Sequence, residues 1–123
     1  MSDITTAIDT YLNAYGESDA TRRRADIACS WEVDGTLVDP PMDATGHEAL
    51  DVMFAAVQGQ FPGHSFRRTS AIDAHHGIAR YSWDLVAPDG TVAVTGMDVA
   101  RVSDAGKLVD VAGFFGPLPE LDT

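Results

Sequence analysis

The apolar residues change from a helical period to a strand period about halfway along the chain. In the first half, spacings of three and four residues predict three helices, at about 4–15, 20–31 and 47–59. In the second half, alternation predicts four strands, at 64–75, 78–87, 91–103 and 107–116. Helices followed by long strands are typical of an α+β domain, in which the helices pack on one face of a curved, mostly antiparallel sheet.

Turn and capping signals separate these elements. A short strand at 36–38 ends at Asp39-Pro40-Pro41, because proline cannot donate to a strand ladder. Thr45 to Glu48 match a capping box, which predicts the start of the third helix. The predicted strands of the second half are joined by short segments rich in Gly, Asp and His. Such short connections join antiparallel neighbours, so we expect a meander.

Composition and charge argue against several classes of function. The 123 residues suit one domain spanning 1–123, with no repeat or linker. The 19 acidic and 8 basic residues give a net charge of −11, which disfavours nucleic-acid partners and anionic membranes. No apolar run approaches the ~20 residues that cross a bilayer, and the N-terminal segment does not resemble a signal peptide. The single cysteine, Cys29, favours a cytoplasmic location, and we interpret it as a small buried apolar residue.

Two segments carry a resemblance to a known superfamily. Residues 31–40, WEVDGTLVDP, place a carboxylate just before a proline. Residues 97–116, MDVARVSDAGKLVDVAGFFG, resemble a final pair of strands that ends in hydrophobic-Phe-Gly. With the order of the predicted elements, these segments resemble the nuclear transport factor 2-like superfamily, which includes SnoaL-like polyketide cyclases and ketosteroid isomerases. The resemblance implies a cone-shaped α+β barrel that encloses an apolar pocket.

The resemblance also implies site residues. Asp39 matches the general base of the ketosteroid isomerases, and Asp98 matches their protonated aspartic acid in the oxyanion hole. Tyr11 matches the hydroxyl donor of that hole. Trp31 and Phe54 occupy places where those isomerases have further tyrosines, so the resemblance implies no relay of phenolic hydroxyls behind Tyr11.

The same residues suggest a chemistry without the resemblance. A carboxylate in an apolar pocket loses solvation, so its pKa rises and it becomes a better base. Abstraction of a proton next to a carbonyl also needs hydrogen-bond donors at the oxygen, where negative charge develops. We expect six side chains to form the apolar wall that binds the substrate: Trp31, Leu37, Phe54, Trp83, Phe114 and Phe115.

Each of the three polar candidates has an alternative interpretation. Asp39 before Pro40 suits a turn, Asp98 suits a solvent-facing or dimer-facing strand position, and Tyr11 suits core packing. The adjacent His75 and His76 would point to opposite faces of a strand, so we predict no metal site. The sequence shows no glycine-rich phosphate loop and no dinucleotide fingerprint, so we expect no cofactor. A pocket acid or base among His64, His75 and His76 stays open.

Three functions follow as hypotheses. The first is a cofactor-free isomerase or cyclase that acts on a small apolar carbonyl compound through proton transfer to an aspartate. The second is a module of the same fold that binds a small apolar molecule without turnover. The third is a structural or assembly role for a dimer formed through the outer face of the sheet, and a homodimer is expected in any case.

Overall fold

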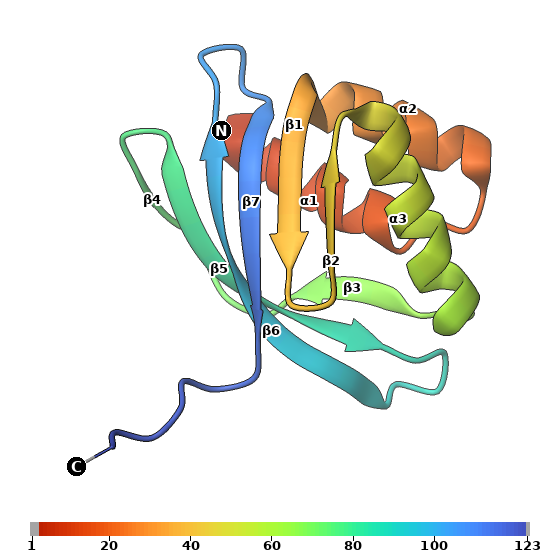
Figure 1. Cartoon of the computed structure of the whole chain (residues 1–123), viewed down its shortest axis with the longest axis vertical. Coiled ribbons are helices and arrows are strands. Elements are labelled where there is room, and N and C mark those ends of the chain that lie inside the picture. Colours follow the sequence, from red (N-terminus) through yellow and green to blue (C-terminus); the bar gives the residue numbers. More distant parts are fainter. Residues whose placement is uncertain (1–2, 123) are drawn as a thin grey trace.

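The structure is a computed structural model that describes residues 3–122, and over this range it contains three helices and seven strands (Figure 1). The helices are α1 (Asp3–Tyr15), α2 (Ala20–Ser30) and α3 (His47–Gln60). The strands are β1 (Trp31–Asp39), β2 (Met42–Thr45), β3 (Ser65–Arg68), β4 (Asp73–His75), β5 (Ile78–Val86), β6 (Val92–Val102) and β7 (Leu108–Phe115).

The strands form one curved sheet in the order β2-β1-β7-β6-β5-β3, with β4 also paired to β5. Only the β1–β7 pair is parallel among the pairings of the described strands. Figure 1 shows the three helices together on one side of the sheet. The predicted α+β class is therefore confirmed. The sheet is open rather than closed into a barrel, because the outer edges of its end strands β2 and β3 pair with no further strand, and α3 and α1 pack against these strands.

The turn at Pro40-Pro41 connects β1 to an additional strand. The prolines lie in a tight hairpin, and the backbone N–H of Met42 donates to Asp39 Oδ1 at 3.2 Å. The chain then pairs back along β1, with Thr45 opposite Thr36. Proline signals were interpreted as the end of a strand, so β2 was not predicted.

The start of α3 differs from the predicted capping box. Thr45 lies in β2, and its hydroxyl is hydrogen-bonded to that of Thr36 at 3.3 Å. The N-cap is Gly46, with a φ of 90° and no side-chain cap bond. Because a positive φ favours glycine, backbone conformation rather than a hydroxyl begins this helix.

One long predicted strand, 64–75, is divided in the structure. Residues 65–68 pair with one half of β5, and residues 73–75 pair with the other half. Between them the chain leaves the ladder, and the Ser70 hydroxyl accepts a hydrogen bond from the Ser82 backbone N–H at 2.9 Å.

Helix α2 shows two departures from the expected pattern. Cys29 is exposed, so the expectation that it is buried is wrong. Arg23 is buried, although a run of three arginines in a helix usually indicates a solvated face. The helix buries Arg23, Ile27 and Ser30, and this spacing of four and three turns Cys29 outward.

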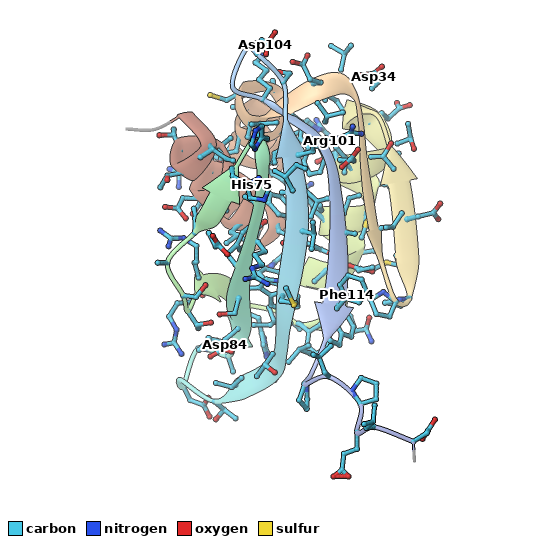
Figure 2. All side chains as sticks on the ribbon, turned by 90° about the vertical axis from the view of Figure 1, so that its left-hand side faces the viewer. Asp34, His75, Asp84, Arg101, Asp104 and Phe114 are labelled. Carbon is cyan, nitrogen blue, oxygen red and sulfur yellow. The ribbon has the colours of Figure 1, made fainter. Side chains whose placement is uncertain are left out.

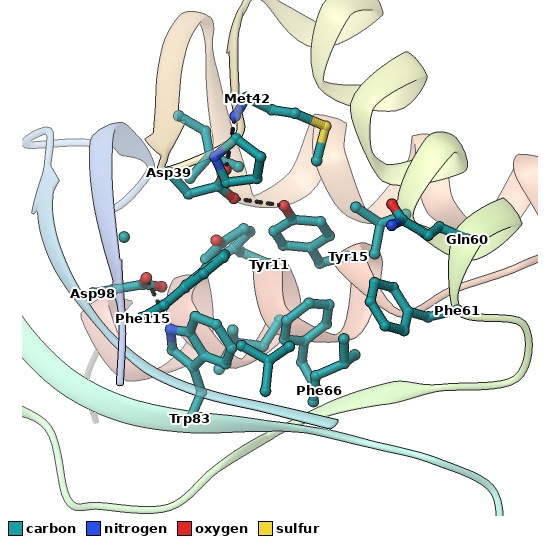
Figure 3. Close-up of a pocket in the computed structure, with 17 residues that line it drawn as sticks. Tyr11, Tyr15, Asp39, Met42, Gln60, Phe61, Phe66, Trp83, Asp98 and Phe115 are labelled. Atoms are coloured by element: carbon teal, nitrogen blue, oxygen red, sulfur yellow. Dashed lines mark hydrogen bonds between the residues drawn. The ribbon is translucent and has the colours of Figure 1, made fainter. Parts of the chain in front are cut away.

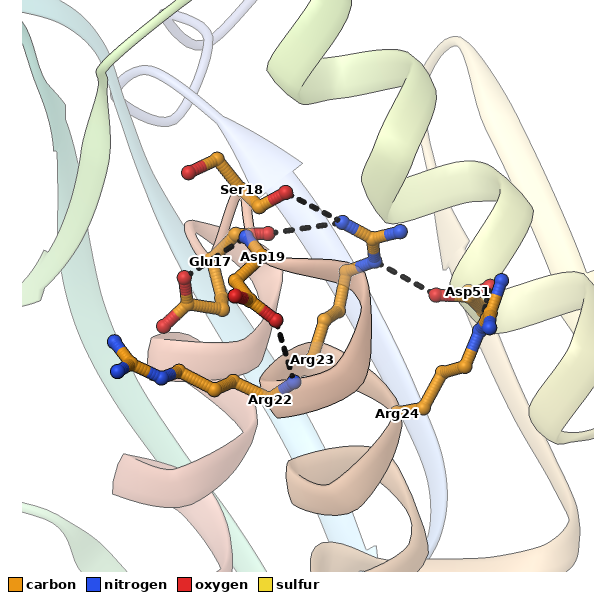
Figure 4. Close-up of polar contacts among 7 residues, drawn as sticks. All are labelled: Glu17, Ser18, Asp19, Arg22, Arg23, Arg24 and Asp51. Atoms are coloured by element: carbon orange, nitrogen blue, oxygen red, sulfur yellow. Dashed lines mark hydrogen bonds and ion pairs between the residues drawn. The ribbon is translucent and has the colours of Figure 1, made fainter.

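The buried Arg23 joins α2 to α3 and to the turn after α1 (Figure 4). Its Nε donates to Asp51 Oδ1 at 2.7 Å, and its Nη1 donates to the Glu17 carbonyl oxygen at 3.1 Å. Arg24 binds the other oxygen of Asp51 from the exposed side. A buried guanidinium needs such partners, so this network fixes how the helices pack.

No helix among the described residues is long and apolar enough to cross a membrane.

Candidate functional site

An apolar pocket of about 330 Å³ lies between the inner face of the sheet and the helices (Figure 3). Six aromatic side chains line it, those of Tyr11, Tyr15, Phe61, Phe66, Trp83 and Phe115. Two carboxyl groups, those of Asp39 and Asp98, face the same space. The described residues that line the pocket include no lysine, arginine or histidine. The pocket is therefore a small hydrophobic cavity with an acidic end.

Asp98 is held on the inner face of β6 by two donors from β5. Tyr81 lies directly opposite Asp98 in the ladder, and its hydroxyl donates to Asp98 Oδ2 at 2.8 Å. Trp83 Nε1 donates to Asp98 Oδ1 at 2.9 Å. Gly96 makes room for this indole, because a Cβ there would lie 2.4 Å from the Trp83 ring.

The pKa of Asp98 is raised to about 6. Burial is the main cause, since the side chain is 2% exposed and its ionised form loses solvation. The hydrogen bonds from Tyr81 and Trp83 oppose the rise, the negative charge of Asp39 adds to it, and the Tyr11 hydroxyl opposes it. Near neutral pH, Asp98 therefore exchanges between its acid and its ionised form.

Asp39 ends β1 at the mouth of the β1–β2 hairpin. The Tyr15 hydroxyl donates to Asp39 Oδ2 at 2.9 Å, while Oδ1 accepts the backbone bond from Met42. Burial raises the pKa of Asp39, and the bonds from Tyr15 and Met42 oppose this rise. One oxygen of Asp39 therefore caps the turn while the side chain also lines the pocket, and its role as a base stays a prediction.

The tyrosines of the pocket are hydrogen-bond donors. Burial raises the pKa of Tyr11, Tyr15 and Tyr81 well above the ordinary value, and the nearby aspartates add to the effect. Their hydroxyls therefore keep their protons at any physiological pH. Tyr11 also packs in the core, with its ring edge-on to Trp31 at a centroid distance of 5.3 Å.

The structure brings together six of the nine predicted site residues. The lining includes Tyr11, Leu37, Asp39, Trp83, Asp98 and Phe115. The other three lie outside it, each for a different reason. Trp31 is completely buried behind Tyr11, and Phe54 is stacked on Tyr15 at 4.3 Å. Phe114 is 56% exposed, because successive residues of β7 point to opposite faces.

Two functional candidates were missed at the sequence level, Tyr15 and Tyr81. Tyr15 follows Tyr11 by four residues, so both lie on one face of α1. Tyr81 alternates with Trp83, which places both on the inner face of β5. The residue spacing indicates which face each tyrosine lies on, but not its partner. The partner of Tyr81 depends on strand register, and that of Tyr15 depends on how α1 packs against the sheet.

The histidines lie away from the pocket lining. His47 Nε2 donates to the Trp31 carbonyl oxygen at 2.9 Å. The expectation that His75 and His76 point to opposite faces is wrong, since their Nδ1 atoms are 3.0 Å apart. His76 has a φ of 52°, which ends the strand and turns the two rings toward each other. Even so, the described residues contain no group of three or more side chains that could bind a metal ion.

Comparisons with known proteins identify close structural relatives. A proposed isomerase of the SnoaL-like family from Agrobacterium tumefaciens is 33% identical with a TM-score of 0.87, and the match covers 95% of this chain and all of that one. A protein of ketosteroid isomerase-like fold from Catenulispora acidiphila, solved with trimethylamine, is 13% identical with a TM-score of 0.70 over 87% of this chain and 82% of that one.

A third structure, a proposed SnoaL-like polyketide cyclase from Jannaschia sp., is 15% identical with a TM-score of 0.67 over 94% of this chain and 89% of that one. The last two likenesses show the fold alone. No protein-family model and no curated protein matches the chain.

Proposed function

Since the chain belongs to the SnoaL-like family, we propose that it is a cofactor-free isomerase or cyclase that acts on a small, apolar carbonyl compound. The observation that supports the proposal most is the pair of carboxyl groups in one aromatic pocket, each bound by a tyrosine hydroxyl. The family and the fold alone do not specify a reaction, so the argument rests on this site.

The two aspartates have different environments, which suits different roles. Asp39 is partly buried, and we assign it as the base that takes a proton from the carbon next to the carbonyl group. Asp98 is deeper and has a pKa of about 6, so about one molecule in ten carries its proton at pH 7, and more do so at lower pH. In that form it donates to the carbonyl oxygen as negative charge develops there.

Tyr11 completes the arrangement as a second donor to the same oxygen. The pocket has no cation to stabilise an enolate among its described lining residues, so neutral donors supply the stabilisation. An isomerase then returns the proton from Asp39 to a different carbon. In a cyclase, the enolate carbon instead attacks a second carbonyl carbon of the same substrate, the electron pair of that C=O bond moves to its oxygen, and this oxygen takes the proton that Asp39 holds.

The experiment is a screen of enones and short polyketide-like ketones, repeated with Asp39→Asn. Removal of a positioned base costs roughly 10²–10⁴-fold in rate. Asp43→Asn is the matched control, because Asp43 is exposed on β2 and lies outside the pocket lining. Equal rates for wild type and Asp39→Asn would refute the role of Asp39.

A second candidate is a binding module without turnover, with a small organic cation as its ligand. The six aromatic side chains and two carboxyl groups suit a cation, since aromatic faces and carboxylates both attract one. The Catenulispora acidiphila protein of similar fold was solved with trimethylamine, which is a small organic cation when protonated. Titration calorimetry with benzyltrimethylammonium, phenylacetate and 2-cyclohexenone distinguishes the candidates. Tight binding of the ammonium alone supports the module, and preference for the enone supports the enzyme.

We also propose that the protein is a cytoplasmic homodimer formed through the outer face of the sheet. Figure 2 shows this face, on which Phe114 and Arg101 lie. Val38, Val99 and Phe114 are exposed there on three neighbouring strands, β1, β6 and β7. Sedimentation of wild type and Phe114→Asp tests the proposal. A wild-type monomer would refute both the dimer and an assembly role based on it.

A further inference from the structure

Gly113 lies between the two aspartates of the pocket. It is on β7, directly opposite Asp98 of β6 in the antiparallel ladder. On its other side, β1 runs parallel to β7 with Val38 beside Ala112, so the next residue of β1, Asp39, lies alongside Gly113. Three adjacent strands thus place Asp98, a glycine without a side chain, and Asp39 side by side across the sheet.

The distances show how narrow this arrangement is. A Cβ built on Gly113 would lie 3.1 Å from Asp98 Oδ1 and 3.3 Å from Asp39 Cβ. Both aspartates therefore approach the same point, the place where any other residue would carry its first side-chain atom. Gly113 itself is buried and lines the pocket.

Backbone conformation does not explain the glycine. Its φ lies outside the left-handed region that holds the turn glycines of this chain. Close packing of the protein's own rings does not explain it either, in contrast to Gly35 and Gly96. At those positions a Cβ would collide with the rings of Trp31 and Trp83, at 2.5 and 2.4 Å. Around Gly113 the crowding atoms are a carboxyl oxygen, a Cβ and a carbonyl oxygen.

We infer that the space above Gly113 is the seat of the reacting carbonyl unit, and that Gly113 is a specificity-determining residue. This inference rests on the proposed function. Because both aspartates reach one point, they act on neighbouring atoms of the ligand, a carbonyl oxygen and the carbon next to it. The seat therefore takes a compact, uncharged C(=O)–CH₂ unit, and the rest of the ligand extends along the aromatic wall toward Phe61 and Phe66.

The test is the series Gly113→Ala and Gly113→Val, with Gly59→Ala as the control. A methyl group at 113 needs only small shifts of its neighbours, so the alanine variant is expected to fold. Gly59 has no atom within 4 Å of a built Cβ and lies outside the pocket lining. We expect Gly113→Ala to lower kcat/KM by at least tenfold, valine to lower it further, and Gly59→Ala to leave it unchanged.

A readout without turnover separates this inference from the proposed function. The methyl group at 113 places an apolar atom against Asp98 Oδ1 and disfavours the ionised form, so the pKa of Asp98 in carboxyl ¹³C NMR should rise above its wild-type value. In wild type, 2-cyclohexenone should shift the amide resonances of Gly113 and Asp98 more than that of Phe61. If both results are obtained but no turnover is found, the proposed enzymatic function is wrong, while the inferred carbonyl site above Gly113 still stands.

Three results would overturn the inference. One is a Gly113→Ala variant with wild-type kcat/KM and a wild-type pKa at Asp98. The other two need no variant: enone-induced shifts around Phe61 that leave Gly113 and Asp98 unaffected, and no binding of the enone at all.

Discussion

The Tyr81 hydroxyl donates a 2.8 Å hydrogen bond to Asp98 across the β5–β6 pair, where the two residues lie directly opposite each other. The same relationship recurs at the other carboxyl group, where Tyr15 of α1 donates to Asp39. Each aspartate of the pocket therefore has a phenolic donor of its own. In both cases the bond lowers a pKa that burial raises, so the tyrosines set how acidic each carboxyl group is.

Replacement of Tyr81 by phenylalanine should raise the pKa of Asp98 above its value of about 6. The variant loses a donor that favours the ionised carboxylate, and a hydrogen bond to a charged group contributes about 1.5–3 kcal/mol. The expected rise is thus on the order of one pKa unit. Carboxyl ¹³C NMR measures it, with Tyr15→Phe as the control that should affect Asp39 more. A lower or unchanged value for Asp98 would show that the bond does not stabilise the anion.

Replacement of Tyr15 by phenylalanine should raise the pKa of Asp39. If Asp39 is the base, the acidic limb of the pH–rate profile then moves to higher pH, because ionised Asp39 forms only above its raised pKa. The measurement is kcat/KM against pH for both proteins. If the NMR titration of Asp39 moves to higher pH while the acidic limb of the rate profile stays in place, Asp39 is not the base of the reaction.

The stability of the fold should depend on pH through Asp98. Its pKa is raised on folding, so the folded state binds the proton more tightly than the unfolded state. The stability that this gives is present below the ordinary pKa of an aspartate and is lost as the pH rises through about 6.

The Asp98→Asn variant has no titrating carboxyl group at this position, so it does not lose this stability as the pH rises. Between pH 4 and pH 7, its free energy of unfolding should therefore rise relative to that of the wild type by on the order of 2 kcal/mol. Urea unfolding at several pH values measures the difference between the two proteins. A constant difference would contradict the pKa shift.

Arg23 should contribute much more to stability than Arg24, although both bind Asp51. Loss of one partner from a buried ion pair costs about 3–5 kcal/mol, whereas exposed pairs contribute about 0–1 kcal/mol. Urea unfolding of Arg23→Gln and Arg24→Gln tests this. Equal losses would mean that the burial of Arg23 and its bonds to the α1–α2 turn have no energetic importance.

The sequence predicted the parts of the site that follow from periodicity. Strand alternation separates the buried Asp98 from the exposed Val99 of β6, and Asp39, which the segment before Pro40 singled out, lines the pocket. The sequence did not predict which hydroxyl groups donate to the two aspartates, since the pairing of Tyr81 with Asp98, for example, depends on strand register. The resemblance directed attention to Trp31 and Phe54, while the hydroxyls came from Tyr15 and Tyr81.

The burial of polar side chains is the second feature that could not be predicted from the sequence. Three consecutive arginines indicate a solvated face, yet the carbonyl groups after α1 and the carboxylate of Asp51 give Arg23 a buried site. Those partners come from other segments, and no local pattern shows that they meet. The same holds for His76, whose positive φ arises from the turn that joins β4 to β5.

Titration of the wild-type protein by carboxyl ¹³C NMR tests the central claim most directly, because it needs neither a substrate nor a variant. The account predicts that Asp98 titrates near pH 6 and that Asp39 titrates above the ordinary aspartate value. Titration of both carboxyl groups near pH 4, as for aspartates in water, would contradict it.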